Sequence, residues 1–79
     1  MYLVSFRSKN ETLKFSSLIA SYGYKQIVVP TPRQIAVSCG ISVRIDYVAL
    51  EVAKLILKRK QFFSFLGIYE ITKDGYVLV

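Results

Sequence analysis

The sequence predicts an α+β fold: a ferredoxin-like βαββαβ sandwich with a short C-terminal hairpin strand. One observation is the order of hydrophobic periods along the chain, which is strand, helix, strand, strand, helix, strand. A second is the length of 79 residues, which suits a single domain over residues 1–79. Two helices would cover one face of an antiparallel sheet, and the other face would stay open unless a second subunit covers it.

The first strand and the first helix are indicated near the N-terminus. Residues 2–7 alternate, with three side chains on one face: Tyr2, Val4 and Phe6. Ser8 and Glu11 then form the S-x-x-E capping box that opens a helix. The apolar residues of this helix recur at the spacing of one helical face: Phe15, Leu18, Ile19 and Tyr22. Gly23 fits the left-handed residue that ends it.

Two short strands follow. The first covers residues 27–29, and Pro30 and Pro32 stop it because proline cannot donate a hydrogen bond to a ladder. The second covers residues 41–45 and alternates cleanly. Three of its side chains are expected on the core face: Ile41, Val43 and Ile45.

The C-terminal half predicts a helix, a long strand and a hairpin. Asp46 can cap a helix over about residues 47–60, which ends in a basic cluster suited to the negative end of the helix dipole. Residues 62–71 form a long aromatic strand. A turn signal at residues 73–75 then returns the chain into a last strand over 76–79.

The apolar content and the net charge indicate which kinds of partner the chain could bind. Hydrophobic residues make up 53% of the chain, with six Tyr and five Phe, which is more than a small monomer easily hides. We therefore expect a homodimer, with pairing along an unpaired strand edge such as that of residues 62–71. The net charge of +6 suits an anionic partner, although it equally serves to keep a small apolar protein soluble.

Several features bear on location. Every apolar run is shorter than the ~20 residues that cross a bilayer. The N-terminus lacks the basic-then-apolar order of a secretory signal, and a single cysteine cannot form an internal disulfide. We expect a cytoplasmic protein that does not associate with membranes.

The residue inventory excludes most catalytic machinery. The chain has no histidine, which excludes Ser-His and Cys-His hydrolases and, with one cysteine, an ordinary zinc site. It has no C-x-x-C pair and no phosphate-binding glycine loop. Each acid has a local structural role: Glu11, Asp46, Glu51, Glu70 and Asp74. We expect neither a self-contained enzyme nor a bound metal or cofactor.

The remaining candidate for chemistry is Cys39, in the segment Pro30-Thr31-Pro32-Arg33-Gln34-Ile35-Ala36-Val37-Ser38-Cys39-Gly40. Thr31 and Gln34 form a T-x-x-Q box around Pro32, which predicts a short helical turn. Backbone freedom at Gly40 would lift Cys39 onto an exposed bend.

Two cations lie near Cys39 in the sequence. If the guanidinium of Arg33 or of Arg44 sits close to the sulfur, it favours the thiolate, and we expect Arg33 in particular to lower the thiol pKa. Binding residues would then be Arg33, Gly40, Pro32 and Arg44. A lone cysteine is also commonly a small buried hydrophobe, so a reactive and a structural role both remain open.

This segment resembles that of a known family. The family's pattern is a strand, a helix that begins in small polar residues, and a Pro-x-Pro-Arg-x-Ile…Cys-Gly segment, which matches residues 30–40. Over about residues 2–71 the chain resembles the selenium/sulfur carrier protein-like family of small bacterial domains. The resemblance implies that Cys39 takes a persulfide or perselenide from a donor protein and passes it to an acceptor.

Two other functions remain possible from the residues. A nucleic-acid module would use Lys54, Lys58, Arg59 and Lys60 as phosphate contacts, but residues 41–45 lack the stacking aromatics of an RNA-recognition strand. We therefore expect no sequence-specific nucleic-acid binding. A non-catalytic interaction or small-ligand module is the other alternative; there Cys39 is structural and residues 30–40 line a cleft.

Overall fold

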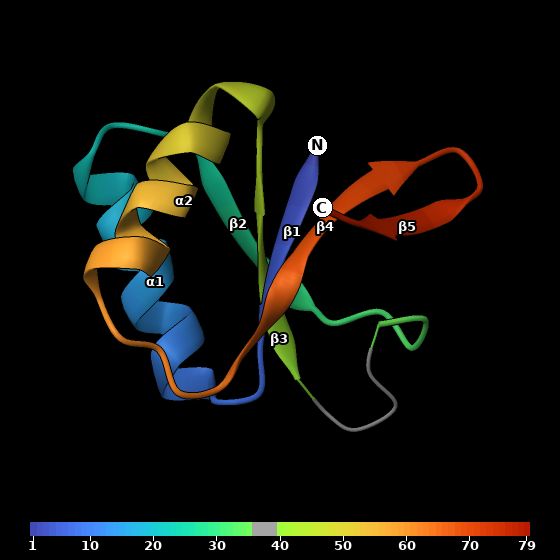
Figure 1. Ribbon diagram of the computed structural model, residues 1–79, viewed down its shortest axis with the longest axis horizontal. Helices are drawn as coiled ribbons and strands as arrows, with labels where there is room; N and C mark the ends of the chain where they lie inside the picture. Colours follow the sequence, from blue (N-terminus) through green and yellow to red (C-terminus); the bar gives the residue numbers. More distant parts are fainter. Residues whose placement is uncertain (36–39) are drawn as a thin grey trace.

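The computed structural model describes residues 1–35 and 40–79 (Figure 1). These residues form two α-helices, one 3₁₀ turn and a five-stranded antiparallel sheet. The α+β prediction is therefore confirmed. In chain order the elements are β1 (Tyr2–Phe6), α1 (Lys9–Ser21), β2 (Gln26–Pro30), β3 (Ile41–Ile45), η1 (Tyr47–Ala49), α2 (Leu50–Arg59), β4 (Phe65–Thr72) and β5 (Gly75–Leu78).

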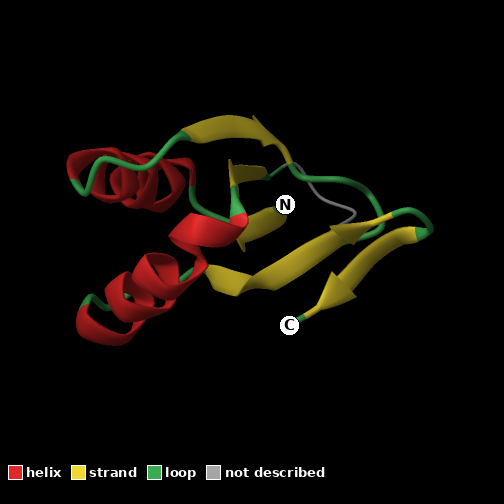
Figure 2. Cartoon of the chain, turned by 90° about the horizontal axis from the view of Figure 1, so that it is seen from above, coloured by secondary structure: helices red, strands yellow, loops and turns green. Residues whose placement is uncertain are grey.

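The strands lie in the order β2-β3-β1-β4-β5, and every neighbouring pair is antiparallel. Both α1 and α2 pack on one face of this sheet, as Figure 2 shows. The arrangement is compatible with the predicted ferredoxin-like sandwich. The short C-terminal hairpin strand that the sequence predicts is present as β5, which folds back along β4 at one edge of the sheet.

The core lies between the helices and the sheet. Val4 of β1 stands opposite Val43 of β3 and Ile68 of β4, so one face of the three central strands is continuously apolar. Four aromatic rings close one end of this core, with centroids 5.3–5.9 Å apart: Phe6, Phe15, Phe62 and Phe65. The predicted core positions Val43 and Ile45 are buried, and Ile41 is half-buried.

The start of α1 differs from the predicted capping box in one partner. The Ser8 hydroxyl accepts a hydrogen bond from the Glu11 backbone N–H (3.3 Å), as the box requires. The Glu11 carboxylate does not return to Ser8 but accepts the backbone N–H groups of Phe63 (2.8 Å) and Ser64 (2.7 Å) and the Ser64 hydroxyl. The hydrogen bond from the Ser64 hydroxyl is the main cause that lowers the pKa of Glu11.

The same contacts explain why β4 begins later than predicted. Ser64 also accepts the backbone N–H of Arg7 at its carbonyl and that of Ser8 at its hydroxyl, so this residue is fixed to the start of α1. The strand therefore begins at Phe65 and not at residue 62. β4 is hydrogen-bonded to β1 on one side, and on the other β5 pairs with its second half, Tyr69–Thr72. The pairing between two copies that we expected along this strand stays a prediction.

The second helix also begins later than predicted. Residues 47–49 form the 3₁₀ turn η1, and α2 starts only at Leu50. The Asp46 side chain makes no capping hydrogen bond there. Neither helix in the described part of the chain is long and apolar enough to cross a membrane.

Candidate functional site

The ends of β2 and β3 bring together the two residues that flank the segment of interest. The Thr31 backbone N–H donates to the Gly40 carbonyl (3.0 Å), next to the last pairing of the ladder. A Cβ atom on Gly40 would lie 3.3 Å from the Thr31 hydroxyl oxygen and 3.4 Å from the Phe6 carbonyl oxygen. Glycine therefore permits a close approach of three chain segments here.

Cys39 itself lies outside the described residues, together with Ala36, Val37 and Ser38. Its predicted exposure on a bend, its protonation and its distance from any arginine therefore stay predictions. The structure does describe the residues on both sides of these four. We call the contact between Thr31 and Gly40, together with the adjoining ends of β1, β2 and β3, the platform.

A row of three hydroxyl groups crosses this platform on the sheet face away from the helices. The Ser5 and Ser42 hydroxyl oxygens are 2.8 Å apart, and those of Ser42 and Thr31 are 2.7 Å apart. Ser5 and Ser42 are fully buried. Each hydroxyl brings one proton and the two bonds use two of them, so one proton remains for an acceptor outside the row.

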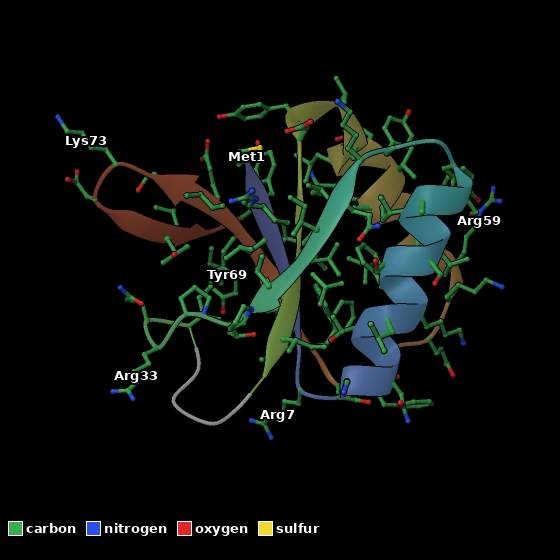
Figure 3. The ribbon with its side chains drawn as sticks, turned by 180° about the vertical axis from the view of Figure 1, so that it is seen from behind. Met1, Arg7, Arg33, Arg59, Tyr69 and Lys73 are labelled. Carbon is green, nitrogen blue, oxygen red and sulfur yellow. The ribbon has the colours of Figure 1, made fainter. Side chains whose placement is uncertain are left out.

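Of the two predicted cations, Arg33 lies on the turn that follows Thr31. The Ile35 backbone N–H donates to the Pro32 carbonyl (3.0 Å), which confirms the turn predicted after Thr31. The Thr31 hydroxyl bonds to Ser42. Pro32 is half-buried and Arg33 is exposed on the turn, where Figure 3 shows its side chain extending outward. The turn therefore presents an exposed guanidinium beside the platform.

Arg44 is placed elsewhere. It sits three residues along β3 from Ile41, where strand geometry separates the two Cα atoms by roughly 10 Å. Its half-buried side chain lines a hollow of about 130 Å³ together with Met1, Lys25, Gln26, Ile27 and Asp46. The structure thus brings Pro32, Arg33 and Gly40 to one end of the sheet, and Arg44 toward the other.

A second cation at the platform, Arg7, was not predicted from the sequence. The ladder of β1 with β3 ends at the pair of Phe6 and Ile41, and continuing the same antiparallel register places Arg7 beside Gly40. Arg7 is exposed, and its backbone is fixed by the hydrogen bond to Ser64 (2.9 Å). Figure 3 shows Arg7 and Arg33 at the same end of the molecule. Only the register of β1 with β3 could have identified Arg7 as a neighbour of Gly40, since Arg7 and Gly40 are far apart in the sequence.

Comparison with known proteins bears on this platform. A family model described as "Putative Se/S carrier protein-like" matches residues 1–70. The chain belongs to this family. The matched range contains the whole segment 30–40 of this Se/S carrier-like chain and ends within β4, so β5 lies beyond it. Neither a curated protein nor a solved structure matches the chain.

Proposed function

We propose that this Se/S carrier-like chain carries sulfur or selenium on the thiol of Cys39. Family membership is the observation that carries the proposal. The residue inventory supports it, because Cys39 is the only cysteine and the chain has no histidine. Persulfide transfer needs one accessible thiolate and no further catalytic group on the carrier, since each partner protein brings its own cysteine. The reducing cytoplasm is the compartment we propose for it.

Loading is a displacement at sulfur. The Cys39 thiolate attacks the outer sulfur of a donor protein's persulfide, forming a new S–S bond as the bond to the donor cysteine breaks. The donor leaves as a thiolate, and Cys39 holds the persulfide. Delivery repeats the displacement with an acceptor thiolate and regenerates the Cys39 thiolate. The sulfur atom moves at the same oxidation level, so neither step needs an oxidant or a reductant, and a perselenide follows the same sequence.

The platform suits this chemistry electrostatically. Loading requires the thiolate, which nearby cations favour. Arg33 and Arg7 are both exposed at this end of the sheet, and a guanidinium remains charged at every physiological pH.

Alkylation of the native protein tests the proposal. Iodoacetamide should modify Cys39 without denaturation, with a pH midpoint below the ~8.5 of a free cysteine. Arg33→Ala should raise that midpoint, because it removes the exposed guanidinium on the turn beside the platform. Arg44→Ala is the matched control and should leave it unchanged, since Arg44 lines a separate hollow. A thiol that reacts only after denaturation would contradict the carrier function and favour a structural cysteine.

The alternative of a nucleic-acid module loses support from the sheet. On the face away from the helices, β1 and β3 present Leu3, Ser5, Ser42 and Arg44, none of which is aromatic. The aromatic residues of these two strands, Tyr2 and Phe6, belong to the face that the helices cover. An RNA-recognition sheet carries several stacking aromatics on the uncovered face of its central strands, whereas the described central strands place one there, Tyr69 of β4, opposite Leu3.

A further inference from the structure

The outer edge of β5 has unpaired backbone groups. The Val79 backbone N–H donates to the Ile68 carbonyl (2.8 Å), in line with the register that pairs Tyr69 with Leu78. Hydrogen-bonding direction alternates along an antiparallel strand, so Val77 faces β4 as Val79 does. The N–H and C=O groups of Tyr76 and Leu78 therefore point away from the sheet.

The two edges of the sheet differ in how they are protected. On one edge, β2 follows Lys25 and ends in Pro30, and lysine and proline are residues that discourage pairing with another chain. On the other, β5 contains neither charge nor proline. Its apolar side chains are exposed: Val77 by 54%, Leu78 by 64% and Val79 by 57%.

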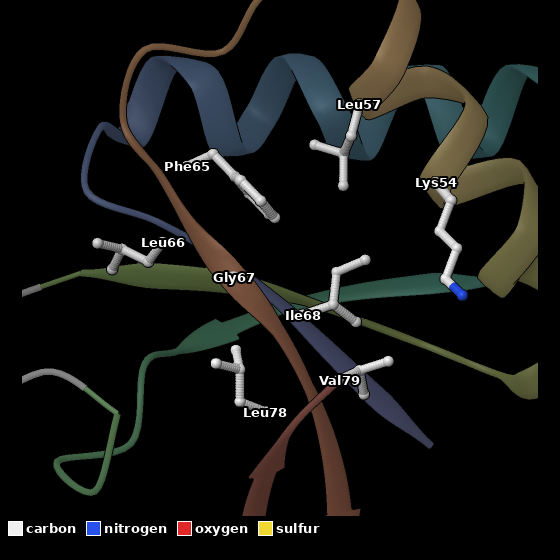
Figure 4. A pocket seen from close by; sticks show the side chains of 8 residues that line it. All are labelled: Lys54, Leu57, Phe65, Leu66, Gly67, Ile68, Leu78 and Val79. Atoms are coloured by element: carbon white, nitrogen blue, oxygen red, sulfur yellow. The ribbon is translucent and has the colours of Figure 1, made fainter.

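An apolar hollow continues this edge toward α2. It has a volume of about 430 Å³, and Figure 4 shows Lys54 and Leu57 of α2 on one side with Leu78 and Val79 on the other. Its remaining lining comes from β4: Phe65, Leu66, Gly67 and Ile68. Val79 pairs with Ile68, whose side chain faces the helices. The side chains of Val77 and Val79 therefore lie on the helix-covered face of the sheet, next to this hollow.

We propose that a second copy of this chain pairs with β5 in antiparallel orientation, so that the sheets of two copies become continuous. The register follows from the outward-facing groups: Tyr76 of one copy exchanges backbone hydrogen bonds with Leu78 of the other, and the two-fold axis passes between the two Val77 residues. Tyr76 then packs on the partner's Leu78 on one face, and the two valines meet on the other.

Charge and symmetry favour a second copy over an acidic partner. Each chain carries a net charge of +6, so the repulsion between two copies is smallest where they meet at an uncharged surface. The β5 edge is such a surface, and Lys54 is the one cation among the residues that line the adjoining hollow. An antiparallel edge is also complementary to itself under a two-fold axis, which a foreign partner does not require.

Mass in solution and amide exchange test the interface together. Light scattering of the purified full chain at tens to hundreds of micromolar should give the mass of two copies. Val77→Lys should give the mass of one, because it places two cations across the axis. Val28→Lys, on the exposed part of β2, is the matched control and should leave the mass of two copies unchanged. Circular dichroism should confirm that both variants fold.

Hydrogen–deuterium exchange of the wild type keeps the proposal falsifiable if Val77→Lys does not fold. The amides of Tyr76 and Leu78 should exchange more slowly as concentration rises, whereas the amide of Val77, already bonded to β4, should not change. A monomer mass at every concentration, a dimer that survives Val77→Lys, or concentration-independent exchange at Tyr76 and Leu78 would each overturn it. Loss of the dimer in Val28→Lys would assign the interface to β2 instead.

Discussion

Replacing Ser42 with alanine removes the middle hydroxyl of the row that joins β1, β3 and the residue after β2. Ser42 is fully buried and contacts both Ser5 (2.8 Å) and Thr31 (2.7 Å). The substitution leaves two hydroxyls without this partner, and a buried unsatisfied polar group costs about 1–3 kcal/mol. We expect Ser42→Ala to lower the free energy of unfolding by about 2 kcal/mol.

The effect is large for a chain of this size. A loss of 1 kcal/mol lowers the Tm by about 4–8 °C in a domain of 60–100 residues, so Ser42→Ala should lower it by roughly 8–16 °C. Urea and thermal unfolding, followed by circular dichroism, measure both quantities. Ser17→Ala is the matched control, because Ser17 is exposed on α1 and its loss should change stability by less than about 0.5 kcal/mol.

A double-mutant cycle with Ser5→Ala isolates the hydrogen bond. Residues that share one buried bond should show a coupling energy of about 0.5–3 kcal/mol. The double variant should therefore be less destabilised than the two single variants together. Equal stability of Ser42→Ala and the wild type, or strict additivity with Ser5→Ala, would refute the hydroxyl row as a stabilising feature of the platform.

Three further predictions concern other parts of the molecule. Gly40→Ala should destabilise the fold by about 1 kcal/mol, measured by urea unfolding, because its methyl group would crowd the Thr31 hydroxyl and the Phe6 carbonyl; unchanged stability would contradict the close approach. The pKa of Glu11 is lowered from 4.5 by its bonds to Ser64, so its contribution to stability is present above pH 4.5 and is lost as the pH falls through the lowered value. Glu11→Gln should thus flatten the pH dependence of the Tm below pH 4.5, and an unchanged profile would argue against the carboxylate as its source. Fluorescence anisotropy with labelled oligonucleotides should show only weak binding that fades steeply with salt, and tight binding to one sequence at physiological salt would revive the nucleic-acid alternative.

Local patterns in the sequence predicted where the helices and strands form better than they predicted which distant residues these elements contact. The alternation of residues 41–45 and the Ser8 cap of α1 are short-range features, and both are present in the structure. Glu11 fits a capping box by spacing, yet its carboxylate bonds to Ser64, 53 positions along the chain. The sequence around Glu11 does not distinguish a bond to Ser8 from a bond to Ser64, because the outcome depends on where the connection between α2 and β4 lies.

The residues that gather at the platform could also be predicted only in part from local sequence. Arg33 and Arg44 were named as cations near Cys39 from their positions in the sequence. The structure places Arg44 three residues along β3 from Ile41, and the distance of either guanidinium from the sulfur stays a prediction. Arg7 reaches the platform through the register of β1 with β3, which the sequence does not specify. The dimer was expected at the aromatic strand, where β1 pairs along one edge and β5 along the second half of the other, and the dimer itself stays a prediction.

Transfer of sulfur to the protein is the measurement that tests the carrier function most directly. The chain is incubated with a cysteine desulfurase and cysteine, and its intact mass is recorded before and after treatment with a thiol reductant. The wild type should gain the mass of one sulfur atom and lose it on reduction, while Cys39→Ser should gain nothing. A wild type that acquires no sulfur, or a Cys39→Ser variant that acquires as much, would contradict the assignment of Cys39 as the carrier thiol.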